Sequence, residues 1–298
     1  MLIFNRFKDR EAKGQEPLEQ RVAQVRRLIE EADYVLIGAG AGLSAAAGLT
    51  YSGEAFEREF RPWIERYHIT DLYTSSFYPF ATEEEKWAYW ARHIWYARFR
   101  PEAAPLYKAL LELVRGKDYF VLTTNVDAQF EKAGFEKARI FATQGDYAYF
   151  QPASGYPKKL YYNEEMVMRM LDATTDCRIP TELVPKVPET GEPLAPNLRS
   201  DDTFVEDAYW HEQAYRYCQF RDKASAHKLL LLEFGVGFNT PGIIRFPFER
   251  LAAENDDTTL VRFNRDYPQL AFPQLKRYVV FQETLDVDLL KDLIRVKV

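Results

Sequence analysis

Hydrophobic and polar positions follow a strand–helix rhythm along most of the chain. Short, continuous apolar runs predict buried parallel strands, and apolar positions at helical spacing between them predict helices that cover the sheet. In residues 17–33, for example, Leu18, Val22, Val25 and Ile29 are spaced to form one helix face. The predicted strands are residues 34–40, 119–125, 138–143, 228–237, 259–264 and 278–282. This rhythm predicts a doubly wound α/β fold with a parallel sheet.

Two stretches interrupt this rhythm. The pattern of residues 54–100 predicts aromatic-rich helices without a strand, and we expect Trp87, Trp90 and Trp95 to pack in a core or form a pocket wall. Between about 150 and 222 the composition changes to prolines with irregular spacing, and we expect no strand–helix rhythm there. We therefore predict one domain made of residues 1–53, 101–150 and 223–298, with inserts at 54–100 and 151–222.

Composition narrows the class of protein. The 298 residues, 47% of them hydrophobic, allow one large domain or one domain with a smaller insert. The 39 Lys and Arg against 45 Asp and Glu give a net charge of -6, and no dense basic run indicates nucleic-acid binding. No apolar stretch reaches the length of about 18 residues that a membrane helix needs, and the charged N-terminus is unlike a signal peptide. We expect a cytoplasmic protein.

Few residues offer metal or thiol chemistry. Cys177 and Cys218 are too few for a disulfide framework or a four-thiolate zinc site, and we expect two buried, reduced thiols. The 4 histidines stand in no metal-binding or catalytic-triad spacing. No metal is predicted.

A glycine-rich turn follows the first predicted strand. Residues 40–45, from Gly40 through Ala41, Gly42 and Ser44, fit the pattern G-x-G-x-x-G/A. Glycine permits the tight turn and lets backbone N–H groups approach a pyrophosphate. A hydride-transferring dinucleotide enzyme would also have a second strand that ends in an acidic residue about 20 residues on. A helical pattern occupies that stretch here, so hydride transfer is the less favoured interpretation.

A second motif, Thr-Thr-Asn-Val-Asp at 123–127, ends the next predicted strand. With the glycine turn, and with Gly48 and Leu49 after it, this motif resembles the sirtuin family from about residue 17 to the C-terminus. The resemblance implies NAD as cofactor, with Asn125 beside the nicotinamide ribose and Asp127 binding the nicotinamide amide. It also implies that these residues line the rest of the cofactor site: Gly40, Ala41, Gly42, Ser44, Gly235, Gly237, Asn264 and the adjacent Arg265.

Several sirtuin motifs are altered. Gln144, before Gly145, stands where the family has its catalytic histidine, and an amide cannot take up a proton at neutral pH. Protein deacylation is therefore not expected. The sirtuin Pro-Asp-Phe-Arg has become residues 50–53, Thr-Tyr-Ser-Gly, and the acyl-peptide clamp has become residues 197–207. The four zinc-binding cysteines fall at Pro152, Gly155, Val187 and Thr190. We expect a degenerate, metal-free zinc-ribbon module held together by packing.

The altered motifs resemble the macrodomain-linked (class M) sirtuins. This resemblance implies protein ADP-ribosylation, with a lipoyl-carrier protein as the type of acceptor and a macrodomain hydrolase as the reversing partner. The missing cysteines depart from that branch. Alternatives that remain are a NAD glycohydrolase, a non-catalytic sensor of NAD or ADP-ribose, and a residual deacylase.

The predicted mechanism needs positioning and electrostatic support more than a strong base. Asn125 and Gln144 would orient the ribose and the incoming nucleophile, while Asp127 holds the nicotinamide. A sensor would have no need for Asn125 and Asp127, which argues against that alternative. Three further carboxylates, Asp146, Asp201 and Asp202, are candidates for extra charges near the site, but solvated loop charges are the favoured interpretation.

Overall fold

A parallel sheet forms the centre of the larger part of the molecule. The computed structural model describes residues 16–272 and 274–294. Six parallel strands lie in the order β3-β2-β1-β7-β8-β9, and this order confirms the predicted doubly wound fold class. Their bounds are β1 Tyr34–Ala39, β2 Asp118–Thr123, β3 Ile140–Ala142, β7 Leu229–Phe234, β8 Thr258–Phe263 and β9 Tyr278–Phe281.

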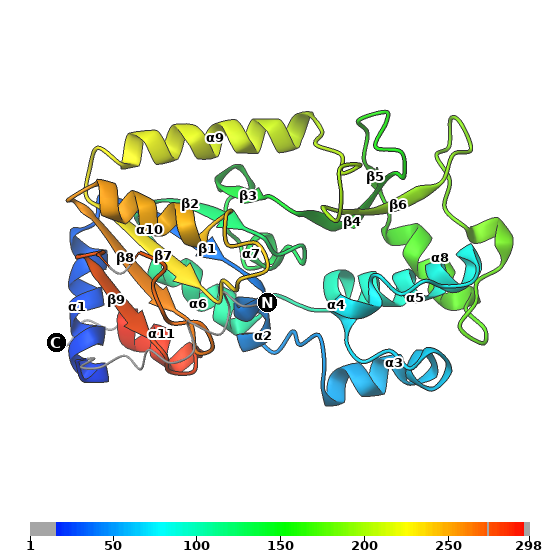
Figure 1. Ribbon diagram of the computed structural model, residues 1–298, viewed down its shortest axis with the longest axis horizontal. Coiled ribbons are helices and arrows are strands. Elements are labelled where there is room, and N and C mark those ends of the chain that lie inside the picture. The colour runs from blue at the N-terminus through cyan, green and yellow to red at the C-terminus, as the bar shows by residue number, and fades with distance from the viewer. Residues whose placement is uncertain (1–15, 273, 295–298) are drawn as a thin grey trace.

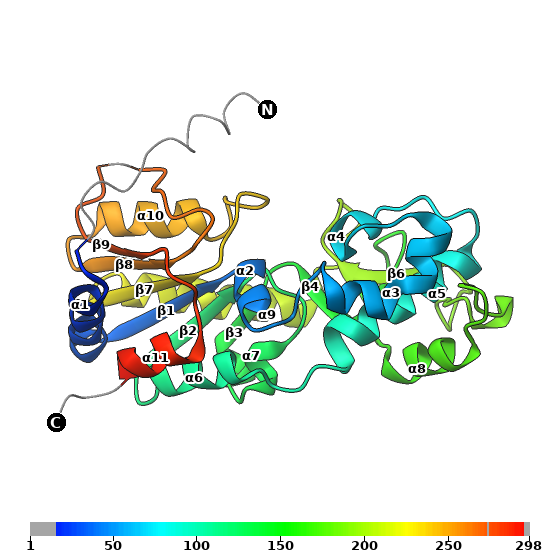
Figure 2. The ribbon, with the colours of Figure 1, turned by 90° about the horizontal axis from the view of Figure 1, so that it is seen from below.

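Helices cover both faces of this sheet, because its strands carry apolar side chains on both faces. Val35 and Ile37 of β1 pack in one core, and Leu36 packs in a second core on the opposite face. Figure 2 shows α10 on one side of the sheet and α6 and α11 on the other. The covering helices are α1 Leu18–Glu31, α6 Pro105–Leu113, α9 Ala208–Ala224, α10 Arg245–Glu254 and α11 Val287–Ile294. Leu18, expected on the buried face of α1, is 40% exposed because it occupies the first helical turn.

The expectation that residues 150–222 contain no regular rhythm is wrong. This stretch contains the 17-residue helix α9, which runs along the top of the molecule in Figure 1. Its aromatic side chains pack on the parallel sheet: the ring centroid of Trp210 lies 4.9 Å from that of Phe141, and that of Phe220 lies 5.7 Å from that of Tyr34. Because prolines precede α9 and many of its residues are polar, the sequence pattern does not indicate this packing face.

The two inserts pack together in a smaller module. Residues 54–100 are helical, as predicted, and Trp87 from this stretch shares one apolar core with Val167 and Met170 of the second insert. The helical elements are α3 Glu54–Tyr67, α4 Leu72–Ser75, α5 Glu83–Ile94, the π-helical turn η2 Trp95–Phe99, and α8 Glu164–Ala173. A three-stranded antiparallel sheet in the order β5-β4-β6 completes the module, with β4 Gly145–Pro152, β5 Tyr161–Tyr162 and β6 Leu194–Leu198.

Four short elements complete the fold: α2 Ala41–Ala46 after β1, α7 Gln129–Lys132 and the 3₁₀ turn η3 Lys137–Arg139 between β2 and β3, and the 3₁₀ turn η4 Thr181–Leu183 in the smaller module. Trp87 and Trp90 are buried in the module's core, and Trp95 is half-buried. Cys177 is buried as expected, whereas Cys218 on α9 is only half-buried. Within the described residues, no helix is both long and apolar enough to cross a membrane.

The module's core includes one of the positions at which the resemblance places a missing zinc ligand. Val187 is 1% exposed and packs among the apolar side chains of the module. Across residues 16–272 and 274–294, no group of three or more His, Cys, Asp or Glu side chains is placed to hold a metal. Apolar packing therefore stabilises this part of the module.

Replacing Val187 with alanine should lower the free energy of unfolding by about 2 kcal/mol, because it removes buried methyl groups and leaves a cavity. Denaturant unfolding measures this loss. A metal chelator should leave the thermal midpoint of the wild type unchanged. A chelator that lowered the midpoint by several degrees would show that a metal stabilises the module.

Candidate functional site

The predicted site residues lie along one edge of the parallel sheet. Gly40, Gly235 and Asn264 directly follow β1, β7 and β8, and Asn125 and Gln144 stand two residues beyond the ends of β2 and β3. These strand ends are aligned in register, so the five residues share the carboxyl edge of the sheet. That edge faces the smaller module (Figure 1). In open α/β sheets this edge is where ligands bind.

The two glycine loops touch each other at this edge. The backbone N–H of Gly42 donates to the backbone oxygen of Gly235 at 3.0 Å. Gly235 has φ of +58°, and a Cβ placed there would lie 2.4 Å from the carbonyl carbon of Gly42. A Cβ on Gly40 would lie 2.8 Å from the oxygen of Gly235. Only glycine fits at this contact, because the backbone of each loop occupies the space that a side chain on the other loop would need.

Replacing Gly235 with alanine should weaken NAD binding about tenfold or more, because the left-handed backbone and the contact with Gly42 both force the loops to shift. Isothermal titration with NAD measures the change. Gly242→Ala is the matched control, since a Cβ there meets no atom within 4 Å. Equal affinity of the two variants would show that the contact between the loops does not shape the site.

A chain of buried polar side chains lies beside the first glycine loop. The Nδ2 of Asn125 donates to the backbone oxygen of Gly40 and to the Oγ of Ser44, both at 3.1 Å. The Oγ of Ser44 in turn donates to the Oδ2 of Asp127 at 2.5 Å. The hydroxyl of Tyr107 completes the cluster, 3.0 Å from the Oγ of Ser44. Three predicted residues are therefore brought together, and Tyr107, on an apolar face of α6, was missed.

Asp127 is a buried carboxylate in this cluster. Burial raises its pKa, while the hydrogen bonds from Ser44 and from the backbone of Gln129 act in the opposite direction. Burial and the charge of Asp127 also raise the pKa values of Tyr51 and Tyr107. Both tyrosines are thus neutral hydroxyls at physiological pH, able to donate or accept hydrogen bonds. Tyr51 belongs to the stretch that replaces the sirtuin Pro-Asp-Phe-Arg.

Gln144 is 8% exposed and lies between the two parts of the molecule. Its backbone oxygen accepts a hydrogen bond from the N–H of Arg199, which follows β6, at 3.0 Å. The Arg199 guanidinium packs over the ring of Phe204 at 4.6 Å and pairs with Glu206. Sequence analysis did not single out Arg199, because nothing local shows that its segment lies beside Gln144.

The three carboxylates that we expected to be solvated differ in their exposure to solvent. Asp146 does not fit the expectation: it lies in β4, and its Oδ1 is 2.7 Å from the Nε of Arg98 in a partly buried ion pair. Arg98 is far away in the sequence, so no local pattern shows the pairing. Asp201 and Asp202 are exposed, and Asp201 accepts a hydrogen bond from the backbone of Thr203.

Of the residues predicted for the adenosine side, Asn264 connects two loops by hydrogen bonds. The Nδ2 of Asn264 donates to the backbone oxygen of Val236 at 2.8 Å, and its Oδ1 accepts from the N–H of Tyr267 at 2.9 Å. Arg265 points its charge toward solvent and pairs with Asp266. Gly237 has open space around it. Asn264 therefore braces the loops after β7 and β8, and Arg265 and Gly237 stay accessible.

Two cavities differ in their relation to this chemistry. A cavity of about 540 Å³ lies within the smaller module, between Trp63, Trp95, Met168 and other side chains, and no predicted site residue lines it. A second cavity, of about 20 Å³, is lined by Asn125 and Asp127 among others. It has room for about one water molecule. The larger cavity therefore does not coincide with the predicted site residues.

Two relatives of this chain have ADP-ribosyltransferase in their names. No model of a protein family matches the chain. It is 35% identical over 242 residues to "Protein ADP-ribosyltransferase" of Staphylococcus aureus (strain Mu50), across 81% of this chain and 77% of that protein. It is 31% identical over 245 residues to "Probable bifunctional ADP-ribose hydrolase/ADP-ribosyltransferase" of Fusarium oxysporum f. sp. cubense, across 78% of this chain but 40% of that protein.

Solved structures share the fold. A Sir2 homologue in complex with NAD matches with a TM-score of 0.58 and 15% identity, across 91% of this chain and 92% of the other. Sir2Tm bound to a propionylated peptide matches with a TM-score of 0.58 and 13% identity, across 92% and 97%. At these identities the likeness establishes the architecture alone.

Proposed function

Because the chain belongs to the protein ADP-ribosyltransferase family of its Staphylococcus aureus relative, we propose that it transfers ADP-ribose from NAD to a protein acceptor and releases nicotinamide. It has the sirtuin fold, in which its structural neighbour binds NAD. The observation that carries the proposal is the buried chain of Asn125, Ser44 and Asp127 beside the contact of the two glycine loops.

The residues present fit NAD as the cofactor. The glycine contact between the two loops shapes the tight turn that leads into α2, where the pyrophosphate of a dinucleotide would lie, and Gly237 has open space around it. Asn125 and Asp127 would hold the nicotinamide ribose and the nicotinamide amide, because an amide N–H can donate to a carboxylate. When bound, NAD supplies the ADP-ribosyl group and a neutral leaving group.

The residues around the site favour transfer over deacylation. Gln144 offers an amide that orients hydroxyl groups but takes up no proton at neutral pH. The attacking group would then come from the acceptor protein itself, and the chain's own residues would supply position and electrostatic support. Asn125 and Gln144, which follow the neighbouring strands β2 and β3, would orient the ribose and that nucleophile.

The finer assignment is the macrodomain-linked branch of sirtuins, acting in the cytoplasm. Its implied partners are a lipoyl-carrier acceptor and a macrodomain hydrolase that removes the modification. Support comes from the Fusarium oxysporum relative, whose name joins an ADP-ribose hydrolase and an ADP-ribosyltransferase in one protein.

The test incubates the purified protein with NAD labelled on its adenosine side and follows nicotinamide release and label transfer separately. Lysate proteins, with and without added lipoylated carrier protein, serve as acceptors. Label on a protein band is the expected result. Released nicotinamide with only free ADP-ribose would instead establish a NAD glycohydrolase. Binding of NAD without turnover, with every acceptor supplied, would indicate a sensor.

A further inference from the structure

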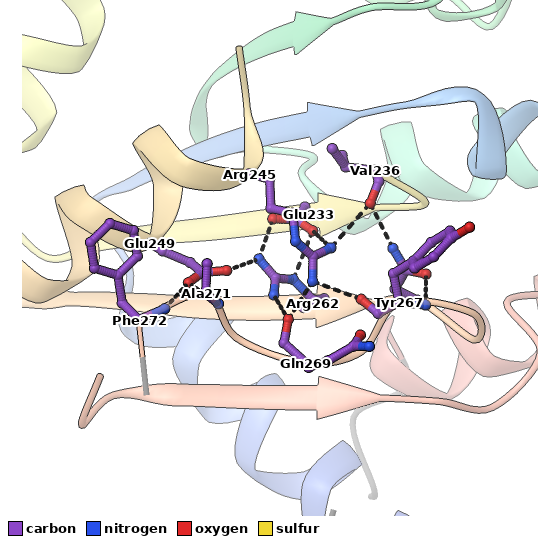
Figure 3. A network of polar contacts seen from close by, with 10 residues as sticks. Glu233, Val236, Arg245, Glu249, Arg262, Tyr267, Gln269, Ala271 and Phe272 are labelled. Carbon is purple, nitrogen blue, oxygen red and sulfur yellow. Dashed lines mark hydrogen bonds and ion pairs between the residues drawn. The ribbon is translucent and has the colours of Figure 1, made fainter. Parts of the chain in front are cut away.

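Four charged side chains of the sheet and of helix α10 are fully buried: Glu233, Arg245, Glu249 and Arg262 (Figure 3). We call them the buried quartet. Glu233 of β7 and Arg262 of β8 lie opposite each other in register, and their Oε1 and Nε atoms are 2.7 Å apart. The Nη2 of Arg262 also lies 2.7 Å from the Oε1 of Glu249, on α10.

Such a cluster needs an explanation other than stability. Removing charges from water is costly, and well-packed apolar side chains often stabilise a core as well or better. Two positive and two negative charges cancel here, so the cluster is tolerated. Its outward hydrogen bonds show what it does.

The buried quartet holds the loop that follows β8. The Nη1 of Arg262 donates to the backbone oxygen of Gln269 at 2.7 Å, an oxygen that Arg245 also contacts. The Oε2 of Glu249 accepts from the backbone N–H groups of Ala271 and Phe272, both at 2.7 Å. Residues 264–272 are therefore fixed by side chains of two neighbouring elements, β8 and α10.

The same cluster reaches the loop that follows β7. The Nη1 of Arg245 donates to the backbone oxygen of Val236 at 3.2 Å, the oxygen that Asn264 also contacts. The Arg245 guanidinium lies 4.4 Å from the ring centroid of Phe238, and that ring packs edge-on against Tyr267. The two loops and the buried quartet thus form one connected unit (Figure 3).

Strand order gives this unit its place in the site. The strands β7 and β8 lie on one side of β1, whereas β2 and β3, which precede Asn125 and Gln144, lie on the other. A dinucleotide bound across the carboxyl edge would place its two halves on these two sides. Since Asn125 belongs to the nicotinamide side, the loops after β7 and β8 belong to the adenosine side.

We infer that the buried quartet is a positioning device that presets the loops 235–238 and 264–272 for the adenosine half of NAD. This inference rests on the proposed function. The four side chains would set the affinity for NAD while taking no part in breaking the bond to nicotinamide. Their loss should then raise KM for NAD and leave kcat unchanged.

The test uses Glu249→Gln, which keeps the shape of the side chain but offers only one acceptor oxygen. Either Arg262 or the N–H groups of Ala271 and Phe272 lose their partner. We expect the Kd for ADP-ribose, by titration, and KM for NAD to rise about tenfold, with kcat within about twofold. Glu249→Asp keeps the charge but is too short to hold Arg262 and the loop together, and it decides the matter if Glu249→Gln does not fold.

Leu229→Ala is the control for lost stability, because Leu229 is buried at the opposite end of β7. It should lower the thermal midpoint and leave the Kd for ADP-ribose unchanged. The inference is overturned if the Glu249 variants behave like Leu229→Ala, less stable but with unchanged Kd and KM. A wild type that binds neither NAD nor ADP-ribose would overturn the proposed function, and this inference with it.

Discussion

Replacing Asn125 with alanine should lower the rate of nicotinamide release from NAD by about 100-fold or more. The side chain is 9% exposed, and its Nδ2 donates to the backbone oxygen of Gly40, to Ser44 and, at 3.3 Å, to the hydroxyl of Tyr107. It therefore fixes the hydroxyls that surround Asp127 and also stands where the ribose is expected. Its loss removes both the direct contact and the order of the cluster.

The measurement is single-turnover release of nicotinamide at saturating NAD, with folding checked by circular dichroism. Asn255→Ala is the matched control, because Asn255 follows α10 at the amino end of β8, on the opposite edge of the sheet. The control should keep the wild-type rate. An Asn125→Ala variant that released nicotinamide at that rate would remove Asn125 from the proposed mechanism.

The central sheet could be predicted because its signals are local. A continuous apolar run such as residues 34–40 shows burial on both faces without reference to any other part of the chain. Helix α9 could not be predicted in the same way. Its packing face is made of Trp210, Tyr217 and Phe220, and only contact with the distant sheet distinguishes that face from the other aromatic residues of the helix.

The candidate site also contains residues that local sequence signals predict and residues that only long-range contacts reveal. Asn125, Asp127 and Gly40 belong to short motifs that end strands, so their meeting at one edge follows from the parallel order. Tyr107 could not be found, since on a helix with an apolar face a tyrosine indicates core packing. Arg98 and Asp146 pair only because the insert 54–100 folds against β4, which is distant in the sequence.

Part of the buried quartet could have been predicted from the sequence. Glu233 and Arg262 each interrupt an otherwise apolar strand, and two opposite charges in neighbouring buried strands indicate a pair. That Glu249 and Arg245 join them from α10 depends on the register between helix and sheet. A charge in a predicted central strand therefore marks a place to look for a partner.

Replacing Asp127 with asparagine should slow nicotinamide release about 100-fold and yet make the fold more stable at neutral pH. Burial raises the pKa of Asp127 above its ordinary value of 3.8. The folded protein therefore holds this proton more tightly than the unfolded chain does. Below pH 3.8 both states are protonated and the carboxyl is tolerated; as the pH rises through the folded pKa, ionisation destabilises the fold.

Asparagine keeps the shape and carries no charge, so the stability lost at neutral pH should be regained. Denaturant unfolding from pH 3 to 8 measures this: Asp127→Asn should be more stable than the wild type at the upper end, and the difference should shrink toward the acid end. Asp222→Asn, on the exposed face of α9, should change neither activity nor stability. A less stable Asp127→Asn at neutral pH would mean that the hydrogen bonds from Ser44 and Gln129 outweigh the cost of burying the charge. An inactive but more stable variant would identify Asp127 as a carboxylate kept for its function at the expense of the fold.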